Sequence, residues 1–193
     1  MISMNEDSGT DKFFHLNVEV RGLLEHSYRL HPQIPDELKW TSNPRIQLWD
    51  EGGGWDTPAS TLTVYEPWTP ETETRRIVRE AVWDSDGDLK SVYKHEYVSP
   101  TIIVRDAYVS SDKYKLFMEQ LSQCSISFMS NSGEGRVDDD VDVEGFAYFS
   151  ADDPAAAIRL SWGLEFPDDW QGVIEIASEL KSYLRSLLES QGE

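Results

Sequence analysis

The chain has 193 residues, of which 36 are acidic and 17 are basic, and its formal net charge is -19 at pH 7. Hydrophobic residues make up 39% of it and aromatic residues 11%, so it has enough apolar area to build a core and is not a disordered acidic tail. We therefore expect the surplus carboxylates on the surface of a folded body. Such a surface repels nucleic acid and anionic lipid, which argues against direct nucleic-acid or membrane binding, and it attracts basic partners.

The length suits one domain, and no change of composition marks a boundary. We expect a flexible polar N-terminus over residues 1–11 and a single α+β domain over residues 12–193. The N-terminal residues lack the apolar run of a secretory signal, and no stretch is apolar for the roughly 20 residues that a membrane span requires. The single cysteine, Cys124, cannot form an internal disulfide and fits a reducing compartment. These features predict a cytoplasmic protein.

The first expected element is a half-buried strand over residues 14–20, where apolar and polar side chains alternate. Residues 22–30 fit a helical turn and a continued strand about equally well. Prolines then interrupt regular structure, and two short strands are expected at residues 45–49 and 60–66, separated by a loop at Gly52–Gly54.

A β-hairpin is the clearest local prediction. Residues 75–83 and 89–98 flank the turn 84–88, in which Asp86 and Gly87 would supply the positive φ angles of a type I′ turn. This register would place four side chains on one face as part of the core: Val78, Val82, Tyr93 and Tyr97. The alternating carboxylates of the turn also suit a calcium loop, but the glycine and the glutamate that such a loop needs at its sixth and twelfth positions are missing.

Residues 101–109 are expected to form a further strand, and Asp112 is expected to cap a helix that runs to residue 123. Apolar side chains at helical spacing support this helix: Tyr114, Phe117, Met118 and Leu121. Three more strands are expected, at residues 125–129, 145–150 and 156–166.

The C-terminal helix is the most regular pattern in the sequence. It begins at Pro167 and Asp168 and ends near Gln191. Its apolar residues form one stripe: Trp170, Val173, Ile174, Ala177, Leu180, Leu184, Leu187 and Leu188. We expect this helix to close the core by lying across the sheet. The whole pattern predicts the α+β class, with a largely antiparallel sheet of about seven to nine short strands and, packed on one face, the C-terminal amphipathic helix and one shorter helix.

No catalytic, cofactor or metal motif is present. The sequence lacks a nucleophile elbow, a phosphate-binding Walker loop and a dinucleotide-binding fingerprint. Its four histidines are scattered, and with a single cysteine they cannot be assembled into a zinc site by their spacing. We therefore expect a binding protein that is not an enzyme and that uses no cofactor or metal.

The segment from Glu134 to Asp153 is the candidate binding surface. It holds eight acids against Arg136 alone, and an acidic run on a folded body can imitate the phosphates that a basic protein binds. Affinity in such interfaces concentrates in a few buried anchors, for which Tyr148 is a candidate. The expected partner-binding residues are Glu134, Asp138, Asp139, Asp140, Asp142, Glu144, Tyr148, Asp152 and Asp153. The alternative is that the run is only a solvated loop.

Acidity, compact size and the lack of catalytic machinery are together typical of immunity and antitoxin proteins. The leading hypothesis is therefore a cytoplasmic inhibitor that neutralises a basic effector, such as a nuclease toxin, through a negatively charged surface. This inference rests on general properties and on no shared motif. The alternative is that the acidity only aids solubility.

Two other functions stay open. Trp55 and Trp68 lie in expected loops beside Asp56 and other carboxylates, as in many glycan-binding surfaces, which would make the chain a carbohydrate-binding or carbohydrate-active module. The same tryptophans could instead cover an end of the sheet. A chain without catalytic motifs also suits a non-catalytic subunit of a larger assembly, including a homo-oligomer.

Overall fold

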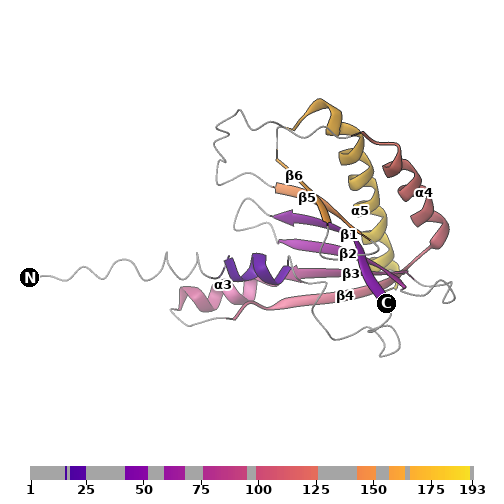
Figure 1. Ribbon diagram of the computed structural model, residues 1–193. Helices are drawn as coiled ribbons and strands as arrows, with labels where there is room; N and C mark the ends of the chain where they lie inside the picture. The colour runs from indigo at the N-terminus through magenta and orange to yellow at the C-terminus, as the bar shows by residue number, and fades with distance from the viewer. Residues whose placement is uncertain are drawn as a thin grey trace, which may run out of the picture.

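The structure, a computed structural model, describes residues 16, 18–24, 42–51, 59–67, 76–94, 99–125, 143–150, 157–163 and 166–191. In this part the chain is α+β, with one antiparallel sheet of six strands and helices on it (Figure 1). The predicted fold class and C-terminal helix are confirmed, whereas the predicted seven to nine strands exceed the six described. The strand expected at residues 125–129 lies outside the described part from residue 126 onward.

Neighbouring strands of the sheet are antiparallel throughout, in the order β4-β3-β2-β1-β5-β6. Their bounds are β1 Ser42–Glu51, β2 Ser60–Pro67, β3 Arg76–Trp83, β4 Ile102–Val109, β5 Val143–Phe149 and β6 Ala157–Trp162. The first four strands therefore follow one another as a meander, and β5 and β6 extend the sheet on the other side of β1. The strands β4 and β6 form its two edges.

Two helices, α4 (Ser111–Ser122) and α5 (Gln171–Gln191), cover one face of the sheet (Figure 1). The predicted apolar stripe of α5 points into this interface, and Leu180 and Leu184 are fully enclosed. Burial of each such leucine contributes about 2 kcal/mol, so apolar contact is the main force that holds α5 on the sheet. The buried strand residues in this core are Ile46, Leu48, Leu62, Val64, Val78, Ala107, Val109, Phe146, Leu160 and Trp162.

The shorter helix α4 forms where the sequence predicts it. Ser110, with an extended backbone, stands at the N-cap position, two residues before the expected Asp112, which lies in the first turn. Tyr114 and Phe117 turn toward the core. The ring of Phe117 lies 5.9 Å from the ring of Tyr183 in α5, at an interplanar angle of 31°, so aromatic contact joins the two helices.

The predicted hairpin is wrong, because β3 is followed by a helix, α3 (Ser85–Tyr93), and not by a paired strand. Asp88, which was expected in the turn, is 4% exposed and sits in this helix. Its carboxylate accepts hydrogen bonds from Trp83 Nε1 at 2.8 Å, from the backbone N–H of Thr101 at 2.7 Å and from Thr101 Oγ1 at 2.8 Å. One buried side chain thus ties α3 to the end of β3 and to the start of β4.

The helix also separates the four side chains that were expected on one core face. Val78 is buried and Val82 half-buried in β3, whereas Tyr93 at the end of α3 is 68% exposed. Tyr97 lies outside the described residues. Gly87 lies within the helical turns of α3, so its backbone does not form the type I′ turn that the Asp-Gly pair indicated.

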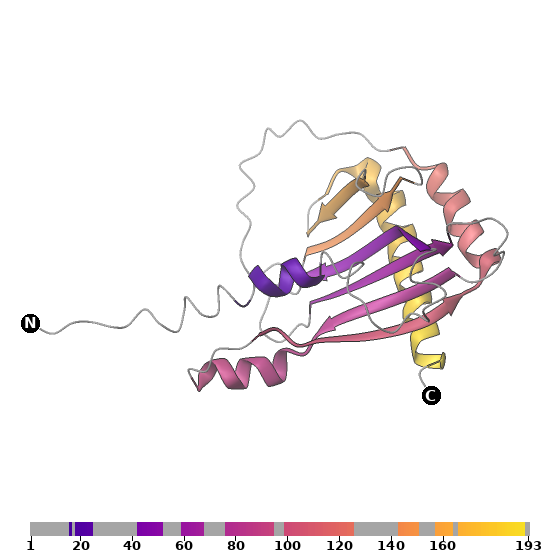
Figure 2. The same ribbon diagram turned by 60° about the horizontal axis from the view of Figure 1, so that its bottom comes forward.

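A second correction concerns the strand expected at residues 14–20, since Leu16 and residues 18–24 are helical. Leu16, Val20 and Leu24 are four apart, share one side of the helix and are buried, whereas Val18 is 54% exposed. With α3, this segment packs on the second face of the sheet, opposite α5, where the buried residues are Ala81, Trp83 and Val92. Figure 2 shows the two helical segments at the same end of the sheet. Helices therefore cover both faces and not one.

Gly145 in β5 lies directly opposite Trp49 in β1, and the indole occupies the space over the glycine. A Cβ atom at Gly145 would lie 2.0 Å from Trp49 Cε2 and Cζ2, well inside van der Waals contact. We expect Gly145→Ala to displace the indole and lower the free energy of unfolding by about 1–3 kcal/mol, measured by urea denaturation. The double variant Trp49→Ala with Gly145→Ala should lose no more than Trp49→Ala alone; strictly additive losses would contradict this contact.

Candidate functional site

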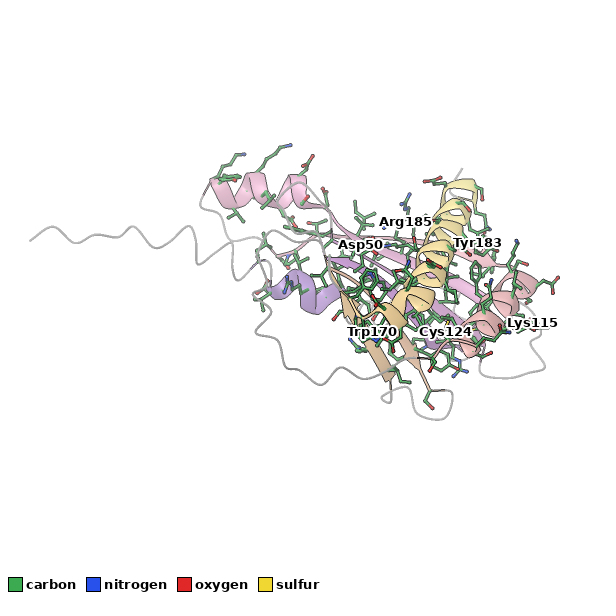
Figure 3. The ribbon with its side chains drawn as sticks, turned by 90° about the horizontal axis from the view of Figure 1, so that it is seen from above. Asp50, Lys115, Cys124, Trp170, Tyr183 and Arg185 are labelled. Carbon is green, nitrogen blue, oxygen red and sulfur yellow. The ribbon has the colours of Figure 1, made fainter. Side chains whose placement is uncertain are left out.

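An ion-pair network joins α5 to one end of the sheet. Lys181 Nζ lies 2.5 Å from Asp50 Oδ1 and 2.7 Å from Glu144 Oε1, and these two acids face each other across β1 and β5. Arg185 Nη2 lies 2.6 Å from Asp50 Oδ2 and 3.2 Å from Ser60 Oγ. Figure 3 shows Asp50 and Arg185 close together beside the helix. Because Lys181 stands between two carboxylates, it offsets the repulsion between them.

The network continues across the sheet toward its β4 edge. Glu80 in β3 is buried, with Arg185 Nε at 3.8 Å on one side and Arg105 Nε at 3.0 Å on the other. At the opposite side, Trp162 Nε1 in β6 donates to Glu144 Oε2 at 3.3 Å. The side chains thus connect α5 with strands β1, β3, β4, β5 and β6, and both bases of α5 are committed to the sheet.

The charged residues on the opposite side of the same helix are all acids. Between Asp168 and Gln191 the only bases are Lys181 and Arg185, and both turn inward. The exposed acids, which we call the α5 acidic face, are Asp168, Asp169, Glu175, Glu179 and Glu189. The two aspartates precede the helix N-terminus, where negative charge stabilises a helix. The glutamates do not stabilise the helix in this way. Like charges four residues apart weaken a helix by a few tenths of a kcal/mol, in round figures, and an acid in the last turn has a similar effect.

A second ion cluster lies at the far end of the covered face, next to α4. Arg45 Nε and Arg76 Nε lie 2.7 and 3.1 Å from the two carboxylate oxygens of Glu66. The guanidinium of Arg45 sits 5.4 Å from the ring centre of Tyr148, and that of Arg76 sits 4.4 Å from the ring centre of Tyr114. Burial and then the negative charge of Glu66 raise the pKa of the Tyr114 phenol, which therefore stays protonated at physiological pH.

The ion pairs in the described residues can be counted. Six bases pair with five acids in these clusters and in the Arg79–Asp106 pair of the second face. The whole chain has 17 bases and 36 acids. In the described part of the chain, these six bases are therefore held by acids of the same fold.

Two of the expected partner-binding residues lie in the described part of the chain. Glu144 forms an ion pair with Lys181 and accepts a hydrogen bond from Trp162. Tyr148, four residues further along β5, lies under the guanidinium of Arg45. Both side chains thus have contacts inside the fold. The others lie outside the described residues: Glu134, Asp138, Asp139, Asp140, Asp142, Asp152 and Asp153. The alternative glycan-binding residues also lie outside them: Trp55, Asp56 and Trp68.

Sequence reasoning missed the α5 acidic face, although the signal for it was present. Glu175 and Glu179 fall on the polar side of the predicted apolar stripe, four residues apart. Ile176 and Tyr183, both half-buried, lie three residues before and four residues after Glu179, so they flank its side chain on the helix surface. The face thus combines fixed carboxylates with partly accessible apolar groups.

Comparison of the chain with protein families, with curated proteins and with solved structures found no match in any of the three. Within the described residues, no three histidine, cysteine or acidic side chains are grouped as metal ligands. None of the helices there combines the length and the apolar content that a membrane span needs.

Proposed function

We propose that the chain is a non-catalytic binding protein that holds a cationic protein partner on its acidic surface. The observation that carries this proposal is the separation of charge on α5, whose bases pair with the sheet while its acids face outward. The specific form that we favour is an inhibitor of the immunity or antitoxin kind, which covers a basic effector such as a nuclease toxin. The nucleic-acid site of such an effector is positively charged, so a surface of fixed carboxylates is its electrostatic counterpart.

The α5 acidic face supports this role because a packed helix fixes the spacing of its charges. Opposite charge speeds the encounter of two proteins, whereas affinity depends on a few anchors that become buried in the complex. Ile176 and Tyr183 are suitable anchors, since they are already partly covered and lie beside Glu179. The acidic run between Glu134 and Asp153 is the second candidate surface in this proposal.

The first step of the test is capture of the partner on the immobilised full chain from native lysate at about 50 mM NaCl, followed by elution at about 500 mM NaCl. Association of the purified partner is then measured with the triple variant Glu175→Gln, Glu179→Gln and Glu189→Gln. We expect its association rate constant to fall by roughly tenfold at low salt, because electrostatic steering is lost. Its stability should stay within about 0.5 kcal/mol of the wild type, because the three glutamates lie on the surface.

Two further variants serve as comparisons. Ser178→Ala with Ser182→Ala alters the same side of α5 without changing charge, and association should stay as in the wild type. Asparagine at Asp138, Asp139, Asp140 and Asp142 tests the acidic run in the same way. If the association rate constant falls in only one of the two acidic variants, the surface altered in that variant is the docking surface. Unchanged association in both, or a complex that is insensitive to salt, would contradict the proposal.

A further inference from the structure

The edge strand β4 has one residue whose main chain is capped by a side chain. Gln191, at the end of α5, accepts a hydrogen bond from the N–H of Tyr108 through Oε1 at 2.9 Å. Its Nε2 donates to the carbonyl of the same residue at 3.1 Å. A residue of a neighbouring antiparallel strand would make the same two bonds. The amide of Gln191 therefore imitates one residue of a further strand, and it shows that the main-chain groups of Tyr108 point away from β3.

Three more residues of β4 present their main chain to the same side. Because main-chain direction alternates along a strand, Ile102, Val104 and Asp106 share the orientation of Tyr108. In the ranges that the structure describes, no hydrogen bond joins their outward N–H and C=O groups to another element. Ile103, between them, is 49% exposed. An open edge of this kind can pair with the edge of another chain.

We propose that this edge pairs with β4 of a second copy of the chain, in antiparallel orientation around a two-fold axis at Val104. The pairing would join the two sheets into one. This inference is independent of the proposed function, since it uses a different surface and a different partner.

Charge favours a second copy as the occupant of this edge. The two charged residues of β4 are already neutralised within the chain, Arg105 by Glu80 and Asp106 by Arg79. On a chain with a net charge of -19, a locally neutral edge is a place where an equally negative copy meets little direct repulsion. A cationic partner would find no surplus of acid there, in contrast to the α5 acidic face.

The side chains of β4 also select the register. With the axis at Val104, this residue faces itself, Ile102 faces Asp106 of the second copy, and all three open residues are paired. With the axis at Arg105 or at Asp106, two like charges would lie directly opposite each other, which destabilises a strand pair. An axis at Ile103 would leave Asp106 opposite Pro100, which has no N–H to donate. The register at Val104 also leaves the contact of Gln191 in place, whereas an axis at Arg105 or Asp106 would put Ile102 or Val104 of the second copy opposite Tyr108.

The interface should be weak. Five paired residues span about 17 Å, and one strand pair covers much less than the roughly 800 Å² per partner of a stable complex. We therefore expect a dimer that forms with rising protein concentration. It should also form more readily at high salt, because salt screens the repulsion between two bodies of the same charge.

Sedimentation velocity of the full chain from about 5 to about 500 µM, at about 50 and about 500 mM NaCl, tests this inference. The wild type and the control Val104→Thr should shift from monomer to dimer, and more so at high salt. Val104→Pro removes the outward N–H without breaking a bond to β3, so it should remain monomeric. A wild type that stays monomeric throughout, or a proline variant that dimerises equally, would overturn the inference.

Cross-linking gives a second test that does not need the proline variant to fold. In a Cys124→Ser background, Val104→Cys would place the two introduced thiols on residues whose Cα atoms are about 5.5 Å apart, within disulfide range. Ile103→Cys is the matched control, because this residue faces Arg105 of the second copy. We expect disulfide-linked dimers several times faster with Val104→Cys than with Ile103→Cys. Equal rates would overturn the register and the dimer it describes.

Discussion

Replacement of Asp88 by alanine is expected to lower the free energy of unfolding by about 3–5 kcal/mol. The carboxylate accepts bonds from Trp83 Nε1 and from both the backbone N–H and the hydroxyl of Thr101, and it is almost fully enclosed. Alanine leaves these donors without their acceptor, and each buried donor without a partner costs about 1–3 kcal/mol. Urea denaturation followed by tryptophan fluorescence measures the loss.

Asparagine at position 88 is the matched control. Its carbonyl oxygen can accept the two bonds that Asp88 Oδ2 accepts from Trp83 and from the Thr101 backbone. Its amide can donate to the Thr101 hydroxyl, which can act as donor or acceptor. We expect a loss of only about 1 kcal/mol. If asparagine were as destabilising as alanine, the three hydrogen bonds would not be the reason that Asp88 is needed.

Loss of the carboxylate at Asp106 is the second change with a large expected effect. Arg79 is 2% exposed and donates through Nε and Nη2 to the two oxygens of Asp106, each at 2.9 Å. Burial alone lowers the pKa of Arg79, but the hydrogen bonds and the charge of Asp106 raise it further than burial lowers it. With Asp106→Ala the buried guanidinium loses its carboxylate, and we expect a loss of about 3 kcal/mol.

The double variant Arg79→Met with Asp106→Leu removes both charges together. It therefore distinguishes the cost of leaving the guanidinium without its carboxylate from the loss of the ion pair itself. Methionine and leucine fill a similar volume without charge, and replacement of a whole buried ion pair by apolar residues is often close to neutral. We therefore expect the double variant to be more stable than Asp106→Ala alone, by about 2 kcal/mol in thermal or urea unfolding. A double variant no more stable than the single one would show that the uncompensated charge is not what destabilises Asp106→Ala.

The elements with one clear period were predictable from the sequence. The stripe of α5 extends over five turns, and only a helix places all of it on one face, so the prediction did not depend on tertiary contacts. The strands β1, β2, β4, β5 and β6 overlap the predicted ranges because β-rich runs stand between turn residues. Fold class followed from these elements alone.

The two wrong predictions arose where the pattern fits a strand and a helix alike. Leu16 and Val20 are two of the alternating residues of a strand and are also four apart, as on a helix; burial of both and exposure of Val18 mark the helix. In α3, the Asp-Gly pair indicated a turn, but the bonds of Asp88 to Trp83 and Thr101 make a helix the better solution. Those bonds join residues that the sequence alone does not bring together.

The sign of the surface charge was evident from composition, but its arrangement was not. Lys181 and Arg185 turn inward because the sheet order brings Asp50 of β1 beside Glu144 of β5, and strand order cannot be read from local patterns. The same order explains why Glu144, one of the expected partner-binding residues, is paired with Lys181.

The inner and outer sides of α5 are subject to different constraints on amino-acid substitution. The core contacts and ion pairs that keep the helix in place belong to its inner side, and Glu179 and Glu189 take no part in the ion pairs described for it. Under the proposed function, substitutions on the outer side would alter the choice of partner and leave the contacts that hold the helix unchanged. Under the same proposal, proteins built on this scaffold would diversify fastest at the outer residues of α5.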